Sequence, residues 1–186
     1  MIKTRLRGVE IGADFTFFAV LAMFLSLDST GFAIMSLSVC LIHEAGHLAA
    51  MLFTKKKPKS IVFSGGGVRI TVSGRQSLSV IVAGSAVNIG LFFLLYFTLP
   101  KNALYPVMFA VLNLVTGVFN LLPIGCLDGK RLLSIFLPER PLAVIETVVT
   151  LLTVIVIAAA FFEGYINFTI VGAIIYIMAV DFFSGV

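Results

Sequence analysis

The only two histidines of the chain stand four residues apart, with a glutamate after the first, in the segment His43-Glu44-Ala45-Gly46-His47. Residues i and i+4 of a helix lie on one face, one turn apart, so both imidazoles can reach a single zinc ion. A carboxylate beside such an ion can accept a proton from water during hydrolysis. The segment therefore predicts a catalytic site for one Zn²⁺ per chain, with His43 and His47 as ligands and Glu44 as the base.

The composition indicates that a membrane protein positions these residues. Hydrophobic residues make up 60% of the 186 residues and charged residues 12%, whereas a soluble domain has about 25% charged residues. The apolar residues form long blocks, so we expect a single polytopic membrane domain over residues 1–186. The basic residues are few and lie between these blocks, so the net charge of +4 does not indicate a nucleic-acid partner.

Six hydrophobic segments approach the roughly 20 residues that a helix needs to cross the hydrocarbon core. We therefore expect an all-α polytopic membrane protein with six transmembrane helices, at about residues 9–27, 32–54, 78–99, 103–122, 142–162 and 165–183. Asp14 interrupts the first segment. A basic N-terminus before an apolar run is also typical of a signal peptide, but no small-x-small cleavage site follows, so we interpret it as an uncleaved first helix.

The basic residues also predict an orientation. If six helices alternate in direction, twelve of the 13 Lys and Arg residues fall on one side of the membrane, and only Lys101 falls on the other. The positive-inside rule then places both termini in the cytoplasm. We expect a multi-pass protein of the cell membrane, in a bacterial plasma membrane.

A catalytic zinc site needs a third protein ligand, and the chain has no third histidine. The remaining candidates are its carboxylates. His47 lies seven residues from the cytoplasmic end of the second segment, or roughly 10 Å along a helix. Asp128 follows the fourth segment on that same side, where Pro123 and Gly125 break the helix and let the chain turn back toward the bundle. Asp128 is therefore the predicted third ligand.

Residues 61–76 predict a small β-hairpin on the cytoplasmic side. Residues 61–63 and 68–72 have strand propensity, and Gly65, Gly66 and Gly67 form a turn signal between them. The hairpin either connects two helices at the surface or dips into the membrane boundary. In the second case it borders the active site, because irregular backbone at membrane depth must face protein or a wet cavity.

Five other side chains have simpler interpretations. We expect Cys40 and Cys126 to be small buried hydrophobic residues, although Cys126 stands two residues before Asp128 and could line the same cavity. We expect Asp14, Glu146 and Asp181 to face the membrane interface or to pair with nearby Lys or Arg, although an intramembrane acid is also a candidate for function.

Three segments together resemble the site-2 protease family of intramembrane zinc metalloproteases. They are His43-Glu44-Ala45-Gly46-His47, then Ala83-Gly84-Ser85-Ala86-Val87-Asn88, with Ser85 where the family usually has proline, and Asn120-x-x-Pro123-x-x-x-Leu127-Asp128-Gly129. The glycine-rich hairpin is similar to the family's membrane-associated β-hairpin. The resemblance covers about residues 30–130, which it implies to be a three-helix catalytic core. With six spans and no inserted PDZ domain, the chain looks most similar to the stage IV sporulation protein FB type, from which it departs because that type commonly carries a C-terminal CBS domain and this sequence does not.

The resemblance implies an intramembrane endopeptidase. Its substrate would be a membrane-anchored protein, cut in or near a transmembrane segment close to the cytoplasmic side. Asn88 and Asn120 would hold the substrate backbone or the developing oxyanion, or else serve as interhelical hydrogen-bonding groups. The hairpin around Gly65, Gly66 and Gly67 would pair with an extended substrate strand.

Partners other than the substrate and the lipid bilayer are less defined by the sequence. A membrane inhibitor or activator protein is compatible with the resemblance, and the oligomeric state is open. The alternative function is a catalytically silent, protease-like scaffold or a zinc-handling membrane protein. A transporter would carry further metal ligands along a path, and an inactive relative would have lost Glu44 or a ligand, whereas this chain keeps them all.

Overall fold

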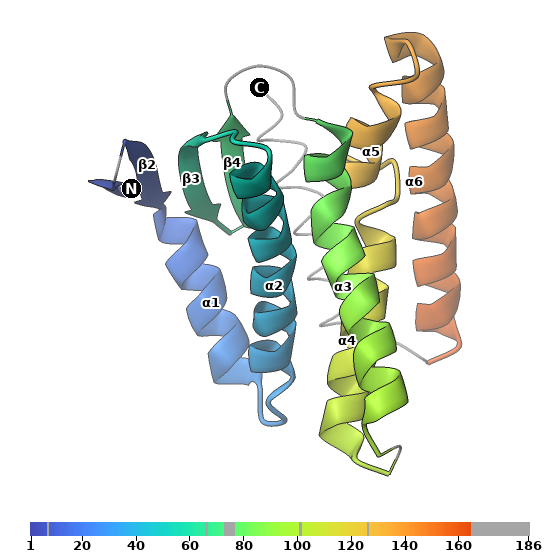
Figure 1. Ribbon diagram of the computed structural model, residues 1–186. Coiled ribbons are helices and arrows are strands. Elements are labelled where there is room, and N and C mark those ends of the chain that lie inside the picture. The colour runs from blue at the N-terminus through green and yellow to red at the C-terminus, as the bar shows by residue number, and fades with distance from the viewer. Residues whose placement is uncertain (7, 66, 73–76, 101, 126, 165–186) are drawn as a thin grey trace. The chain divides into compact units, whose positions relative to one another are not determined.

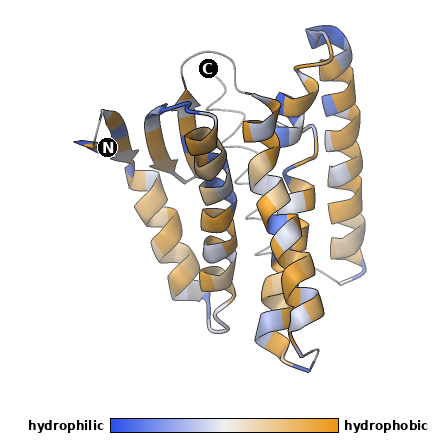
Figure 2. Cartoon of the chain, in the orientation of Figure 1, coloured by the Kyte–Doolittle hydropathy of each residue, from blue (hydrophilic) through white to orange (hydrophobic). Residues whose placement is uncertain are grey.

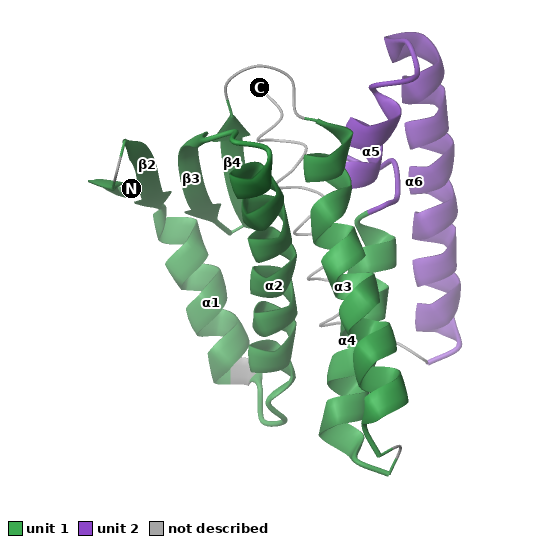
Figure 3. Ribbon diagram, in the orientation of Figure 1, with its two compact units in different colours: residues 1–120 green, residues 121–186 purple. Residues whose placement is uncertain are grey.

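The computed structural model describes residues 1–6, 8–65, 67–72, 77–100, 102–125 and 127–164. Within these ranges, mostly helical structure accompanies one small sheet (Figure 1). The chain divides into two compact units, residues 1–120 and residues 121–186 (Figure 3). The organisation of residues 1–186 as a single membrane domain stays a prediction.

The sheet of the first unit has four strands in the order β1-β2-β3-β4. They are β1 (Ile2–Leu6), β2 (Val9–Ala13), β3 (Pro58–Ser64) and β4 (Gly67–Val72). The pairs β1–β2 and β3–β4 are antiparallel hairpins, and β2 joins them by pairing with β3 in parallel. The predicted hairpin is therefore one half of a larger sheet, and its predicted residues 73–76 lie outside the described residues.

The two faces of this sheet differ in chemistry. Residues opposite one another on neighbouring strands point to the same face. One row contains Arg5, Glu10, Ser60 and Thr71, and the next contains Thr4, Ile11, Ile61 and Ile70. On the apolar side, the ring centroid of Phe63 lies 5.4 Å from that of Phe17, so the sheet packs against the helix that follows β2.

The first predicted transmembrane helix is wrong over its first five residues, because Val9–Ala13 forms β2. Helix α1 (Phe15–Leu27) begins only after Asp14, whose Oδ1 accepts a hydrogen bond from the Phe17 backbone N–H at 3.0 Å. This is an N-cap, which satisfies a helix donor and fixes the start. The remaining 13 residues rise roughly 20 Å, short of a hydrocarbon core of roughly 30 Å.

Three further helices complete the first unit: α2 (Phe32–Phe53), α3 (Leu78–Thr98) and α4 (Leu104–Phe119), which contact one another. Small residues bring their backbones close, as is usual between membrane helices. A Cβ on Gly46 of α2 would lie 2.9 Å from the Ala83 carbonyl oxygen of α3. A Cβ on Gly117 of α4 would lie 2.8 Å from Cγ1 of Ile89 on α3.

The second unit contains a short helix, α5 (Asp128–Leu133), and a long apolar one, α6 (Glu139–Phe162). Helix α4 ends at Phe119 instead of reaching the predicted residue 122, and the turn that follows contains Pro123 and Gly125, as expected. Gly125 has a positive φ of 49°, a conformation that costs glycine least. Helix α5 was not predicted.

Helices α2, α3 and α6 are long and apolar enough to cross a membrane, whereas α1 and α4 are shorter apolar helices. Many large apolar side chains of these helices are exposed, and hydrophobic residues predominate along the helices (Figure 2), as expected for helices surrounded by lipid. Cys40 is exposed on α2, so its predicted burial is wrong: an apolar side chain on a lipid-facing helix does not need the protein core. The predicted helix at 165–183 and Cys126 lie outside the described residues, and the count of six helices stays a prediction.

Candidate metal centre

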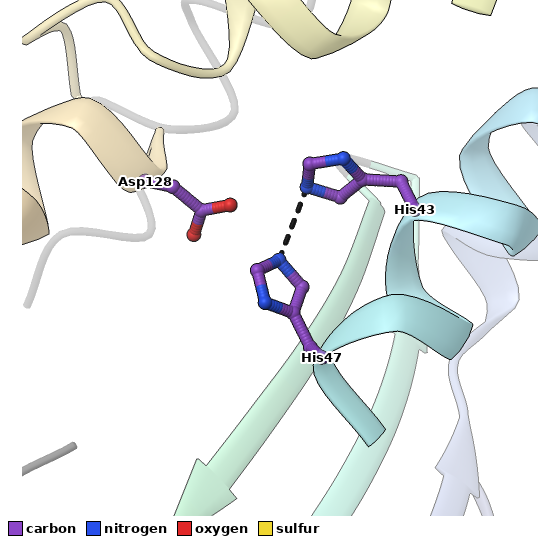
Figure 4. Close-up of side chains that lie close together, drawn as sticks. All are labelled: His43, His47 and Asp128. Atoms are coloured by element: carbon purple, nitrogen blue, oxygen red, sulfur yellow. Dashed lines mark hydrogen bonds between the residues drawn. The ribbon is translucent and has the colours of Figure 1, made fainter. Parts of the chain in front are cut away.

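The two histidines lie one turn apart on α2, and both are buried, with 5% and 8% of their surface exposed. Their Nε2 atoms approach to 3.1 Å, because both rings turn toward the same point (Figure 4). Two nitrogens that share a tetrahedral zinc ion at about 2.05 Å would lie about 3.3 Å apart. The separation in α2 therefore fits a pair of ligands to one zinc ion.

A hydrogen bond to the backbone orients one of these rings. Nδ1 of His47 lies 2.7 Å from the Val80 carbonyl oxygen, on helix α3. A carbonyl oxygen can only accept, so this contact places a proton on Nδ1, and in the neutral ring that leaves Nε2 without one. The lone pair of Nε2 is then available to a metal, the arrangement in which outer partners usually hold a ligating histidine.

Helix α3 leaves space for the imidazoles at Gly84. A Cβ at this position would lie 2.5 Å from Nε2 of His47 and 2.7 Å from Nε2 of His43. Both distances are too short for any side chain, so a glycine is required where α3 faces the two nitrogens. Gly84 belongs to the segment Ala83–Asn88 that resembles the site-2 protease family, but the resemblance predicted no role for it.

Glu44 follows the first ligand on α2 and is half-buried, whereas both neighbouring histidines are buried. It therefore keeps some access to the exterior of the unit. A proton acceptor needs this property, because it must meet both water and substrate.

Three polar side chains are fully buried in the first unit, at 0% exposure: Ser85 and Asn88 on α3 and Asn113 on α4. Within the described residues, the Ser85 hydroxyl and both amide atoms of Asn88 have no hydrogen-bond partner, and neither has Oδ1 of Asn113. Buried polar groups usually have partners, so these atoms have capacity for a ligand or for water. Asn113 was not predicted as a site residue, although its spacing of four and seven residues from Gly117 and Asn120 puts all three on one helix face.

Asn120 caps the end of α4. Its Nδ2 donates to the Thr116 carbonyl oxygen at 2.9 Å, one turn earlier. The amide nitrogen of Asn120 therefore already serves the helix, and among the described residues no side-chain contact is seen for its Oδ1.

Asp128, also drawn in Figure 4, belongs to the second unit and is the first residue of α5. Its carboxylate is buried, with 5% exposure. Within this unit, Oδ1 lies 3.5 Å from the Arg131 guanidinium on the next turn. The following Gly129 leaves no room for a side chain, because a Cβ would overlap the carbonyl group of Leu121. The chain is thus tightly folded around the aspartate.

The glycines of the hairpin divide between a turn and a strand. The Gly65 N–H donates to Oγ1 of Thr16 at 2.8 Å, which ties the turn to α1. Gly67 begins β4 with a φ of 119°, a value that disfavours other residues. Gly66 lies outside the described residues.

Two comparisons with known proteins found similarities to this chain. A family model, Peptidase family M50, matches residues 101–163, a range that includes Asn120 and Asp128. The fold is similar to that of the site-2 protease from Methanocaldococcus jannaschii, with a TM-score of 0.61 and 20% sequence identity over 98% of this chain and 90% of that chain. No curated protein matches the sequence. The family match covers residues 101–163, and the structural match shows a similarity of fold.

Proposed function

We propose that this chain is an intramembrane zinc endopeptidase of the site-2 protease type. One Zn²⁺ would be held by His43, His47 and Asp128, and Glu44 would act as the base. The observation that carries the proposal is the pair of buried imidazoles on α2, with Nε2 atoms 3.1 Å apart. The bond from His47 Nδ1 to the Val80 carbonyl oxygen supports it further, since in the neutral ring it directs the lone pair to Nε2.

Asp128 is the proposed third ligand for two reasons. Three protein ligands and one open position are the usual set at a catalytic zinc site, and the chain has no third histidine. The Asp128 carboxylate is buried, and a carboxylate oxygen is one of the ligands that zinc takes in proteins.

The chemistry divides between the ion and the side chains. Zinc would supply Lewis acidity, which polarises the peptide carbonyl and makes a water molecule more acidic. Glu44 would accept the proton of the attacking water and return it to the leaving amine. Asn88 would donate its amide to the substrate backbone or the oxyanion, and Oδ1 of Asn120 would accept from a substrate N–H.

The position of the ligands on α2 supports a substrate that is itself anchored in the membrane. Helix α2 is long and apolar enough to span the bilayer. His47 stands six residues before its last residue, Phe53, or about 9 Å along the axis. The bond to be cut would therefore lie near one end of a transmembrane segment, on the cytoplasmic side if the basic residues determine orientation as expected.

Several finer assignments belong to this proposal. The protein would be a multi-pass component of a bacterial plasma membrane with both termini in the cytoplasm, and an inhibitor or activator protein would share that membrane. Within the family we assign the stage IV sporulation protein FB type. The segments that carry the ligands are not separated by an insertion of PDZ-domain length, which supports this assignment.

The sheet would present the substrate as an extended strand. Both edges of β3 are already paired, with β2 and with β4. Among the described strands, only the outer edges of β4 and β1 can accept a new strand. We assign the substrate to β4, which begins at Gly67 and belongs to the glycine-turn hairpin.

The decisive experiment is cleavage of a panel of single-span membrane substrates by the purified chain and by Glu44→Gln, with bound zinc measured in both. We expect cleavage by the native chain alone and equal zinc in the two proteins. Zinc without cleavage of any substrate would favour the silent scaffold or the zinc-handling protein. A native chain without zinc would overturn the site.

Proline substitutions at Arg69 and Ile70 test the role of β4. Successive backbone N–H groups of a strand point to opposite edges, so one substitution removes a donor toward β3 and the other removes a donor on the outer edge. We expect the outer-edge variant to lose cleavage while its fold and zinc content are retained. Unchanged cleavage in both variants would contradict pairing through β4.

A further inference from the structure

Glu146 is a charged residue in the first third of an apolar helix, and it has specific partners. It lies on α6, a helix with the length and composition of a membrane span. Its Oε1 accepts two hydrogen bonds, from the Gly125 backbone N–H at 3.0 Å and from Nζ of Lys130 at 2.7 Å. Only 24% of the Glu146 side chain is exposed. The expected pairing of Glu146 with a nearby Lys or Arg is therefore confirmed.

The two donors lie on either side of Asp128. Gly125 precedes it by three residues in the turn after α4, and Lys130 follows it by two residues in α5. One carboxylate oxygen thus fixes the chain before and after the proposed metal ligand. The Leu127 N–H also donates to the Ile124 carbonyl oxygen at 3.0 Å, which tightens the same turn.

A charge on a membrane helix is costly unless it has a partner, and such residues commonly mark a function. An exposed ion pair would contribute little to stability. This pair is partly buried, and it includes a backbone donor that a mere surface pair would not need.

We infer that Glu146 is a positioning residue for Asp128: it holds the turn and the start of α5 so that the carboxylate has one orientation toward the metal. The inference rests on the proposed zinc site. It assigns a role in metal binding to α6, a helix that the sequence resemblance left outside the catalytic core of residues 30–130.

The test is zinc affinity, measured by competition with a chelating fluorescent indicator and independent of any substrate. Glu146→Ala removes both hydrogen bonds, and we expect the Kd for zinc to rise on the order of 10- to 100-fold, the usual effect of losing an outer partner of a metal ligand. Glu139→Ala, an exposed position on the same helix, is the matched control and should leave the Kd unchanged.

A rescue variant separates positioning from general stability. Glu146→Gln combined with Lys130→Met keeps an acceptor for the Gly125 N–H and removes both charges together, so we expect an affinity close to that of the native chain. Lys130→Met alone leaves the Glu146 charge without its ion-pair partner, and this variant should bind zinc more weakly than the double variant.

The outcomes distinguish the two proposals. If Glu146→Ala lowers the unfolding temperature of the metal-free protein but leaves the Kd unchanged, Glu146 is only structural and the inference is wrong. If Glu146→Ala does not fold, the double variant decides: a Kd raised as far as in Lys130→Met alone contradicts positioning through Gly125. A native chain that binds no zinc would overturn the zinc site itself, and the inference with it.

Discussion

Gly84 determines how closely helix α3 can approach the two histidine rings. The space that a Cβ would need is occupied by Nε2 of His43 and Nε2 of His47, the two atoms that would bind the metal. A residue without chemistry of its own therefore controls the geometry of the residues that have it.

Gly84→Ala should weaken zinc binding on the order of 10-fold or more, because the methyl group must push the imidazoles apart or push α3 away from α2. Equilibrium dialysis against buffered zinc measures the effect. Gly90→Ala on the same helix is the control, since nothing lies within 4 Å of its Cβ. If the Gly84→Ala variant binds zinc with the affinity of the native chain, the imidazole rings do not need the space that Gly84 leaves.

The ligand pair itself could be predicted, because a spacing of four residues on one helix is a local property. The partners of that pair could not. Val80 and Gly84 reach the histidines only through the packing of α3 on α2, about 35 residues away in the chain, and no pattern within either segment encodes that contact. Asn113 was missed for the same reason.

At the scale of elements, the start of helix α2 depends on Asp28. Its carboxylate accepts from the Thr30 N–H at 2.9 Å and from the Ala33 N–H at 2.8 Å. These backbone hydrogen bonds, that of Thr30 first, hold the pKa of Asp28 below its ordinary value of 3.8. The ionised carboxylate therefore fixes the entry into the helix that carries both histidines.

Asp28→Ala should lower the unfolding temperature at neutral pH, and the difference from the native chain should vanish in acid. The folded state lowers the pKa, so the stabilisation is fully present above pH 3.8 and is lost as the pH falls through the folded-state value. Thermal unfolding in detergent between pH 2.5 and 7 measures this. Glu163→Ala, at the exposed end of α6, should give no such convergence.

The sheet illustrates what element prediction from sequence misses. The strands of the β3–β4 hairpin could be predicted, because strand propensity is a local property of the sequence. Strands β1 and β2 were interpreted as a charged terminus and the start of a membrane helix, because Val9–Ala13 adjoins an apolar run. Strand β2 pairs with its neighbour β1 and also, in parallel, with β3 about 50 residues later, and this second pairing is not encoded within the segment itself.

At the scale of the whole molecule, the chain combines few buried side chains with many exposed apolar ones. Within the described residues the hydrophobic core is small, and the largest fully buried side chains include the polar Asn88 and Asn113. A bound ion that ties elements together should therefore contribute a noticeable part of the stability in detergent.

Removal of zinc by a chelator should lower the unfolding temperature of the native chain. A ligand at 100 times its Kd stabilises a fold by about 2.7 kcal/mol, which corresponds to about 5–10 °C for a domain of this size. Differential scanning fluorimetry with and without chelator measures the shift. His47→Ala should show none, and an equal shift in that variant would assign the stabilisation to another site.

The parallel pairing of β2 with β3 has a consequence for the two edges of the β3–β4 hairpin. One edge of the hairpin is permanently occupied by the chain's own N-terminal strands, so the protein contains an internal example of strand addition. Removal of residues 1–13, which form β1 and β2, would expose that edge of β3 and give the hairpin two edges that can accept an extended peptide. The N-terminal strands therefore block the β3 edge of the hairpin and leave the outer edge of β4 as the edge of the hairpin that is open to an added strand.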